Sequence, residues 1–314
     1  MYYSIKHSTH FRYAEVVNES ITEVRMHPRS DQAQRCSNFI LRVSPRAKIH
    51  HHRDFFGNLV HHFDTPRSHS QLSILSNAVV EMLDAPQIPL SLEEFHWAEI
   101  DEATRLGAYY FELAPSPLTQ TTGLLRNLAR ELNVDRRRND PLGLLRELNS
   151  AINGYFDYSP RSTDVDSPID VALSLKKGVC QDFAHIMITI VREFLHIPCR
   201  YVSGYLFHAV EEHDRSAEDA THAWVEAWLP GLGWVGFDPT NNLIAGERHI
   251  RVAIGRDYQD VPPTRGVVKG NAESEITVAV EVKPCAAPVS DLDNIEAISH
   301  PIEVLSQQQQ QQQQ

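Results

Sequence analysis

The chain has 314 residues, of which 42% are hydrophobic and 22% charged, and its formal net charge is −12 at pH 7. This length allows two domains with cores of their own. The acidic balance argues against a nucleic-acid partner, which would favour a basic stripe. A mean hydropathy of −0.34 and the lack of a long apolar run argue against a membrane-spanning segment.

The four cysteines have no regular spacing, which is typical of a protein in reducing cytosol rather than of a disulfide framework. The first residues, Met1 to His7, hold no apolar signal core. We therefore expect a cytoplasmic protein that binds neither nucleic acid nor membrane. The sequence leaves its oligomeric state open.

Short alternating runs of apolar and polar residues fill the first part of the chain. Alternation with a period of two is typical of half-buried strands. Residues 1–90 are therefore predicted to form a β-rich N-terminal domain. Its predicted strands are residues 3–13, 37–43, 47–53, 58–64 and 70–83.

Histidines cluster in this domain on either side of a predicted turn. Residues 50–52 are three successive histidines before the turn at 57–58, and residues 61–62 are two more after it. Imidazole is a common metal ligand, but no acidic or cysteine partner stands at ligand spacing. We expect a solvated hairpin here, and neither a metal site nor a cofactor anywhere in the chain.

Leucines at helical spacing follow the β-rich region. Residues 94–112 and 121–153 are predicted helices. The proline-rich break at 115–117 is typical of a boundary. It separates a helical connector, residues 91–118, from a second domain, residues 119–285.

A strongly helical run begins at Cys180. Apolar residues recur at helical spacing from Phe183 to Phe194, which predicts a buried central helix that ends before Pro198. Cys180 thus lies at the N-terminus of this helix. Unpaired backbone amides and the helix dipole stabilise a thiolate there, and the same amides can hold a developing oxyanion.

Three alternating segments downstream are predicted strands. They cover residues 199–207, 222–229 and 234–238, and a short turn at 230–233 joins the second to the third. His222 opens the second strand. Hairpin pairing therefore brings it near Asp238 at the end of the third.

An offset of a few residues remains between His222 and Asp238 in this hairpin. We expect a bulge or the Pro239 bend to supply it.

Cys180, His222 and Asp238 stand in the order that a thiol acyl-transfer enzyme needs. A thiol is a poor nucleophile until it ionises, so it needs a base, and the base needs an orienting acid. A lone buried cysteine or a lone histidine more often has only a structural role. The joint arrangement at a helix start and on adjacent strands is specific, and it predicts a catalytic triad.

Two polar neighbours of Cys180 are interpreted as structural. Asp182 lies in the first helical turn, where an acid compensates the helix dipole. His185 falls on a different face of the helix from Cys180.

The end of the chain has two further features. Residues 276–282 alternate like a late strand that returns to the N-terminal domain. Residues 286–314 end in the glutamine run 307–314 and are predicted to form a disordered tail.

Three segments carry a family resemblance: Gly-Val-Cys-Gln-Asp-Phe-Ala-His at 178–185, His-Ala-Trp-Val-Glu-Ala-Trp at 222–228, and Gly-Trp-Val-Gly-Phe-Asp-Pro-Thr-Asn at 233–241. They resemble the core of the transglutaminase-like superfamily, in particular its bacterial cysteine protease branch. The family's Cys–His–Asp triad falls on the three residues identified above. Residues 3–13 and 54–58 are similar to that branch's bacterial transglutaminase-like N-terminal domain.

The resulting expectation is an α+β protein with a β-rich N-terminal domain and a papain-like core, in which a helix packs on an antiparallel sheet. Its predicted activity is thiol-dependent acyl transfer. Water as acyl acceptor makes the protein a cysteine peptidase or amidase with a peptide or amide substrate, which we favour because water is always present. An amine acceptor makes it a protein-glutamine transamidase (a transglutaminase). A non-catalytic binding module is the remaining alternative.

The chain departs from the family at one position. Animal-type transglutaminases place an oxyanion-stabilising tryptophan well upstream of the cysteine, and no tryptophan lies between Trp97 and Cys180. Tyr155 through its hydroxyl and Gln181 through its backbone amide are the candidate substitutes.

Overall fold

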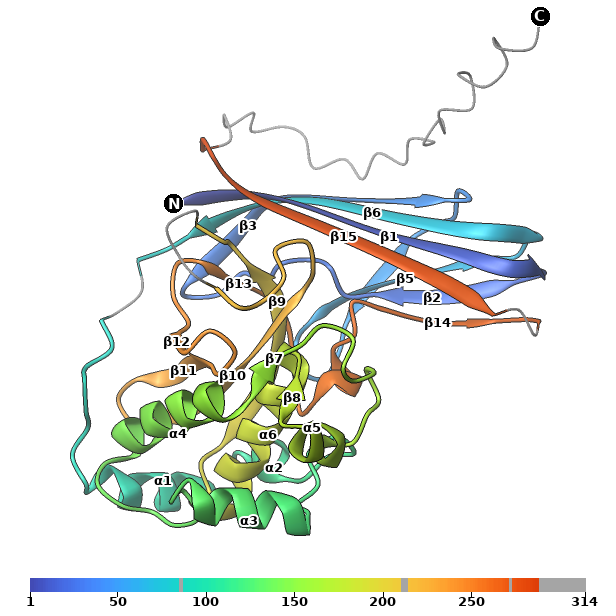
Figure 1. Ribbon diagram of the computed structural model, residues 1–314. Coiled ribbons are helices and arrows are strands. Elements are labelled where there is room, and N and C mark those ends of the chain that lie inside the picture. Colours follow the sequence, from blue (N-terminus) through green and yellow to red (C-terminus); the bar gives the residue numbers. More distant parts are fainter. Residues whose placement is uncertain (85–86, 210–213, 271–272, 288–314) are drawn as a thin grey trace, which may run out of the picture.

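The N-terminal domain is a sandwich of two four-stranded antiparallel sheets (Figure 1). The computed structural model describes residues 1–84, 87–209, 214–270 and 273–287. The sheets have the strand orders β15-β1-β6-β3 and β14-β2-β5-β4. These strands are β1 (Tyr2–Val17), β2 (Ser20–Val24), β3 (Gln34–Ser44), β4 (His50–Arg53), β5 (Leu59–Thr65), β6 (His69–Met82), β14 (Thr264–Val268) and β15 (Ser274–Cys285).

Alternation along the strands builds the core of this sandwich. Tyr13, Val24, Phe63 and Leu72 come from both sheets and are buried together. Removing apolar surface from water in this way is the main favourable contribution to folding. The strand period of two leaves the intervening side chains of β6 half-buried or exposed.

The last two strands of the chain complete the two sheets. β15 pairs with β1 from Tyr2 opposite Cys285 to Tyr13 opposite Ser274. β14 pairs with β2. The segment after the core therefore lies in the N-terminal sandwich and holds both domains together.

The second domain packs helices against one face of a five-stranded antiparallel sheet of order β12-β11-β10-β9-β13 (Figure 1). Its strands are β9 (Cys199–Leu206), β10 (His222–Leu229), β11 (Gly233–Asp238), β12 (Leu243–Ile244) and β13 (His249–Gly255). Its longer helices are α1 (His96–Arg105), α3 (Gly123–Glu131), α4 (Pro141–Tyr155) and α6 (Cys180–Ile190). The predicted α+β fold class is confirmed.

Short elements connect these parts. They are α2 (Tyr110–Leu113), α5 (Ile169–Leu175), the parallel pair β7 (Asp157–Tyr158) and β8 (Lys177–Gly178), a π-helical turn over Val191–Leu195 that extends α6, and a 3-10 turn over Tyr258–Asp260.

The central helix α6 is buried from Gln181 to Ile190. On β10, Ala223 and Val225 face it and belong to the main apolar core together with Phe183 and Met187. Strand geometry then directs His222 and Trp224 to the opposite face of the sheet. That face lies toward the N-terminal sandwich.

Each predicted long helix is two helices in the structure. The segment 94–112 holds α1 and α2, and the segment 121–153 holds α3 and α4. α4 starts at a strong boundary, because the Asp140 side chain accepts a hydrogen bond from the Gly143 amide and Pro141 is the first helical residue.

Within the described ranges, no helix has both the length and the apolar character needed to cross a bilayer. The predicted tail from residue 288 onward, with its glutamine run, lies outside the described residues.

Candidate active site

Cys180 is the first residue of α6, and its side chain is partly buried. The Asp182 carboxylate accepts hydrogen bonds from the Val179 amide at 2.8 Å and from the Thr163 hydroxyl at 2.6 Å. These bonds hold the entry to the helix, so Asp182 has a structural role. The first amides of an α-helix have no acceptor within the helix, so those next to Cys180 are candidate donors for a group at the thiol.

The structure places His222 and Asp238 in direct contact. His222 Nε2 lies 2.8 Å from Asp238 Oδ2. Both residues are buried, with exposed fractions of 3% for His222 and 0% for Asp238. The β10–β11 register pairs Val225 with Phe237 without a shift. Continuing this register by one residue places Asp238 opposite Trp224. His222 lies two residues before Trp224 on the same face of β10, so it is the diagonal neighbour of Asp238.

The β10–β11 pairing contains no bulge, which was one of the two expected sources of the offset. A diagonal pair on one face of an antiparallel sheet lies within reach of long side chains, and this reach supplies the offset.

The two ring nitrogens of His222 have different roles. Nε2 donates to Asp238, which leaves Nδ1 as the nitrogen that can accept a proton. Nδ1 has no partner at hydrogen-bond geometry in the part of the chain that is described, yet Cys180 is close enough to raise the pKa of the ring. The Cys180–His222 contact is thus looser than a full hydrogen bond, as is common before a substrate binds.

The charge environment favours a protonated His222. Burial lowers its pKa, but the charge and hydrogen bond of Asp238 and the neighbouring Cys180 raise it by more, to about 10. A protonated imidazole beside a thiol stabilises the thiolate. The structure thus brings Cys180, His222 and Asp238 together, and their catalytic role stays a prediction.

Asp238 is held by five hydrogen bonds. Oδ1 accepts from the Thr240 and Asn241 amides at 3.0 and 3.2 Å. Oδ2 accepts from His222, from the Asn241 side chain at 2.9 Å and from His249 Nε2 at 3.2 Å. Burial raises the carboxyl pKa, but the two histidines lower it by more, so the pKa of Asp238 lies well below its ordinary value and the group is an anion.

His249 is a member of this site that sequence reasoning missed. The Gly246 amide donates to its Nδ1 at 3.3 Å, so Nε2 carries the hydrogen that Asp238 accepts. Burial is the largest influence on its pKa and lowers it, which keeps the ring neutral at pH 7.

Two glycines explain how His249 reaches Asp238. A Cβ atom on Gly236 would meet Ala245 Cβ at 2.4 Å, and one on Gly204 would meet the carbonyl oxygen of Ile250 at 2.2 Å. Only glycine therefore lets the 245–250 segment lie this close to the sheet. A sequence pattern does not show this approach.

His222, Asp238 and His249 are also the one group of described residues whose possible metal-ligand atoms lie within 4.8 Å of one another. Hydrogen bonds account for the arrangement, because both imidazoles donate to the same carboxylate oxygen. These two donors and Asn241 occupy Oδ2. The group therefore needs no ion to hold it together.

Tyr158 lies near the thiol and Tyr155 does not; Tyr201 and Tyr258 are close enough to Cys180 for its charge to raise their pKa values as well. Tyr155 donates to Glu131 on α3 at 3.3 Å, and Lys176 stacks over its ring. Burial and a negative charge at Cys180 raise the pKa of Tyr158 to about 12. The Tyr158 hydroxyl accepts from the Ala217 amide at 3.4 Å, and among the described residues its own hydrogen has no acceptor.

The remaining candidates near the site are structural. Burial lowers the pKa of His185 to about 3, and its Nε2 accepts from the Tyr258 amide at 3.2 Å. Burial also raises the pKa values of the Cys36 and Cys199 thiols, each to about 11. These thiols stay protonated at neutral pH.

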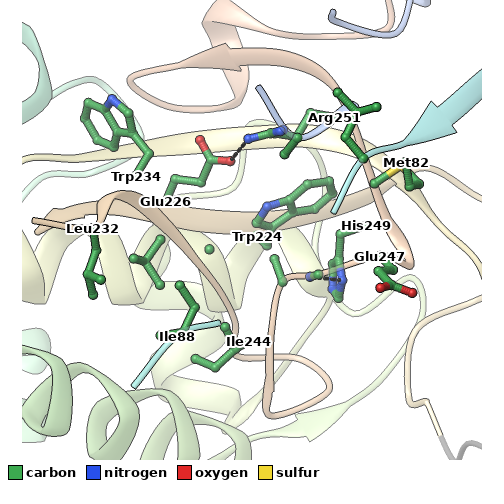
Figure 2. A pocket seen from close by; sticks show the side chains of 16 residues that line it. Met82, Ile88, Trp224, Glu226, Leu232, Trp234, Ile244, Glu247, His249 and Arg251 are labelled. Carbon is green, nitrogen blue, oxygen red and sulfur yellow. Dashed lines mark hydrogen bonds and ion pairs between the residues drawn. The ribbon is translucent and has the colours of Figure 1, made fainter. Parts of the chain in front are cut away.

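A cavity of about 290 Å³ lies behind the triad, on the sheet face that carries Trp224 (Figure 2). Figure 2 shows the Trp224 ring between the Glu226–Arg251 ion pair and His249. The described residues that line the cavity include His249 but neither Cys180 nor His222. The cavity is therefore in contact with His249, which supports the triad through Asp238, and it does not open onto the thiol.

Comparisons with known proteins agree with this architecture. Residues 3–81 match the model of the bacterial transglutaminase-like N-terminal region, and residues 126–239 match that of the transglutaminase-like superfamily. A crystal structure from Cytophaga hutchinsonii, described as that of a candidate cysteine protease, covers 92% of both chains with a TM-score of 0.68 and 21% identity.

Three curated relatives are similar to the chain. An uncharacterized protein of Mycobacterium tuberculosis is 35% identical over 295 residues, 90% of this chain and 92% of the relative. One of Mycobacterium leprae is 30% identical over 280 residues, 88% of this chain and 97% of the relative. A protein-glutamine gamma-glutamyltransferase of Pseudomonas aeruginosa is 31% identical over 134 residues, 39% of this chain and 19% of the relative. The chain belongs to the transglutaminase-like superfamily and carries the bacterial transglutaminase-like N-terminal region.

Proposed function

We propose that Cys180, His222 and Asp238 are the catalytic triad of a thiol-dependent enzyme that hydrolyses a peptide or amide bond. The observation that carries this proposal is the buried 2.8 Å contact from His222 Nε2 to Asp238. It leaves Nδ1 of the same ring as the base nitrogen beside Cys180. The nucleophile Cys180, the base His222 and the orienting acid Asp238 are then linked in that order through the two ring nitrogens.

In the first half of the reaction, the Cys180 thiolate attacks the carbonyl carbon of the substrate and forms a C–S bond. The protonated Nδ1 of His222 gives its proton to the leaving nitrogen as the C–N bond breaks. The products of this half are a free amine and a thioester on Cys180. Asp238 keeps the imidazole in the required tautomer throughout.

In the second half, a water molecule attacks the thioester carbonyl while Nδ1 takes its proton. The C–S bond breaks, the acid product leaves, and the thiolate–imidazolium pair is restored. A primary amine in place of water gives transamidation by the same steps. The similarity to the Pseudomonas aeruginosa glutamyltransferase favours this second candidate.

The oxyanion formed in both halves needs hydrogen-bond donors. The first-turn amides of α6 and the Tyr158 hydroxyl are the donors we assign to it. Tyr158 would then replace the tryptophan that animal-type transglutaminases use.

A cytoplasmic site of action belongs to the same proposal. All four cysteines are free thiols, as expected for a reducing compartment. A reducing compartment also protects a thiol nucleophile from oxidation.

The direct test is the capture of the acyl-enzyme. The protein is mixed with p-nitrophenyl acetate and with a library of peptides and simple amides, and intact mass spectrometry follows. We expect one added acyl group, located on Cys180 by peptide mapping, and none on the Cys180→Ala variant. A folded wild-type protein that neither acylates nor turns over any amide would instead be a binding module.

The acyl acceptor is decided with the best substrate from that library. A primary amine is added at increasing concentration, and the acid and amide-exchange products are separated. Dominance of the acid product at high amine supports the hydrolase. Predominant exchange product at low amine would establish the transamidase.

A further inference from the structure

We propose that the β4–β5 hairpin binds a divalent transition metal ion of the Zn²⁺, Ni²⁺ or Cu²⁺ class, with His50, His52 and His62 as its ligands. This site lies in the N-terminal sandwich and is independent of the triad. The sequence alone predicted no metal here, because it could not show how many of the histidines share one face. The strand register shows it.

The register sets three of the histidines on one face of the hairpin. His50 pairs directly with His62, and His52 pairs with Val60. Side chains of paired residues point to the same face, and positions i and i+2 of one strand share it as well. His50, His52 and His62 therefore form a triangle on the outer face of the hairpin.

The ring separations match those of ligands around one ion. The ring centroids of His50 and His62 lie 5.6 Å apart, and those of His52 and His62 lie 5.4 Å apart. Metal–nitrogen distances of about 2.0–2.1 Å put two imidazoles on a tetrahedral ion about 5 Å apart, centroid to centroid. Imidazole suits Zn²⁺, Cu²⁺ and Ni²⁺ among the divalent ions.

Two of the three rings are free to turn toward the third. His50 and His52 are exposed, and the Nδ1 atom of the half-buried His62 is buried without a hydrogen-bond partner in the described part of the chain. The three nitrogens do not yet lie within one coordination shell. Exposed rings change rotamer within nanoseconds, so rotation of His50 and His52 toward His62 completes the site at little cost.

The backbone beneath the site is held in place. In the connecting turn, Asp54 Oδ1 accepts from the Phe56 and Asn58 amides at 3.0 and 2.9 Å. The Asn58 side chain bonds to the Ile254 amide at 2.9 Å and to its carbonyl oxygen at 2.8 Å, which fixes the hairpin on the core domain. A preorganised frame lowers the cost of bringing three ligands together.

The carboxylate of Glu23 lies next to this triangle, because Glu23 pairs with His62 across β2 and β5. Its Oε2 is 3.3 Å from the Arg25 guanidinium. We therefore assign the ligand set to the three imidazoles and the fourth position of a tetrahedral ion to water.

The inner face of the same hairpin supplies a matched control. His51 pairs with His61 there, and Phe39 stacks on His61 with a centroid separation of 5.2 Å. His51 is on the same strand as His52 and is also exposed, but it points to the other side, where its ring lies 5.9 Å from that of His61. If the metal binds on the outer face, substitution of His52 weakens binding and substitution of His51 does not.

The test uses the full chain without a histidine affinity tag and in the Cys180→Ala background, because the thiol could itself bind zinc. Zn²⁺ and Ni²⁺ binding is measured by equilibrium dialysis with metal analysis. Co²⁺ absorbance then reports the coordination geometry. We expect one ion per chain and a dissociation constant that rises at least ~10-fold in each of His50→Gln, His52→Gln and His62→Gln. His51→Gln should change it less than ~3-fold.

Two results would overturn the proposal: no saturable binding of one ion per chain, or equal weakening by His51→Gln and His52→Gln. Circular dichroism confirms that each variant is folded, and the exposed His50 and His52 tolerate substitution. The proposed catalytic activity does not enter this test.

Discussion

Replacing Asp238 by asparagine removes the charge that orients His222 while keeping the size of the side chain. Asp238 accepts five hydrogen bonds, two on Oδ1 and three on Oδ2. The amide group of asparagine has only one acceptor oxygen. Whichever way it turns, its NH₂ group faces at least two donors, so either the backbone or His222 loses its acceptor.

The loss of charge sets the scale of the effect. The rise of the His222 pKa from 6.5 to about 10 corresponds to about 5 kcal/mol, and Asp238 supplies the largest favourable share. Loss of most of this stabilisation predicts a fall in kcat of about 10²–10⁴-fold. KM should change little, because Asp238 is buried and does not face the substrate.

The assay compares kcat and KM of wild type and Asp238→Asn on the amide substrate found by library profiling. Asp54→Asn serves as the matched control, because Asp54 also accepts backbone hydrogen bonds but lies in the N-terminal sandwich. A folded Asp238→Asn variant that keeps kcat within ~10-fold of wild type would refute the orienting role.

Three further changes test the rest of the site. Tyr158→Phe should lower kcat about 10–10²-fold with Cys180 alkylation unchanged, because only the oxyanion donor is lost, and an unaltered kcat would remove it from that role. His249→Leu should lower kcat about 10-fold and His249→Gln should restore most of it, since glutamine can still donate to Asp238; no rescue would count against a positioning role. For folding, the raised pKa of His222 stabilises the protein fully below pH 6.5, and this contribution is lost as pH rises toward about 10. The advantage of wild type over His222→Gln in urea unfolding should therefore shrink over that range, and a constant advantage would contradict the assigned shift.

The elements with strong periodicity could be predicted from the sequence, and so could the contact between His222 and Asp238. Apolar spacing identified α6, and alternation identified β9, β10 and β11. These signals follow from burial of one face of each element. Local sequence was sufficient here because the elements pack directly against one another.

What the sequence could not supply depends on contacts between distant segments. β2 has only five residues, and β14 is largely exposed, so neither shows a sustained alternation, and both are defined by their mutual pairing. The role of His249 depends on two glycines that let its segment approach the sheet. Tyr158 and Tyr155 stand three residues apart, and only the fold shows which of them is near the thiol.

The central claim is that His222 activates Cys180, and site-resolved alkylation with iodoacetamide tests it most directly. Mass spectrometry follows all four cysteines in one sample, with the partly buried Cys36 as the internal reference, since burial raises its pKa to about 11. At pH 6.5 an ordinary thiol with a pKa of ~8.5 is about 1% thiolate. We predict that Cys180 reacts at least ~10²-fold faster than Cys36 at this pH, and that His222→Gln removes most of the difference. Reaction of Cys180 at the rate of Cys36, or a rate that His222→Gln leaves unchanged, would contradict the account.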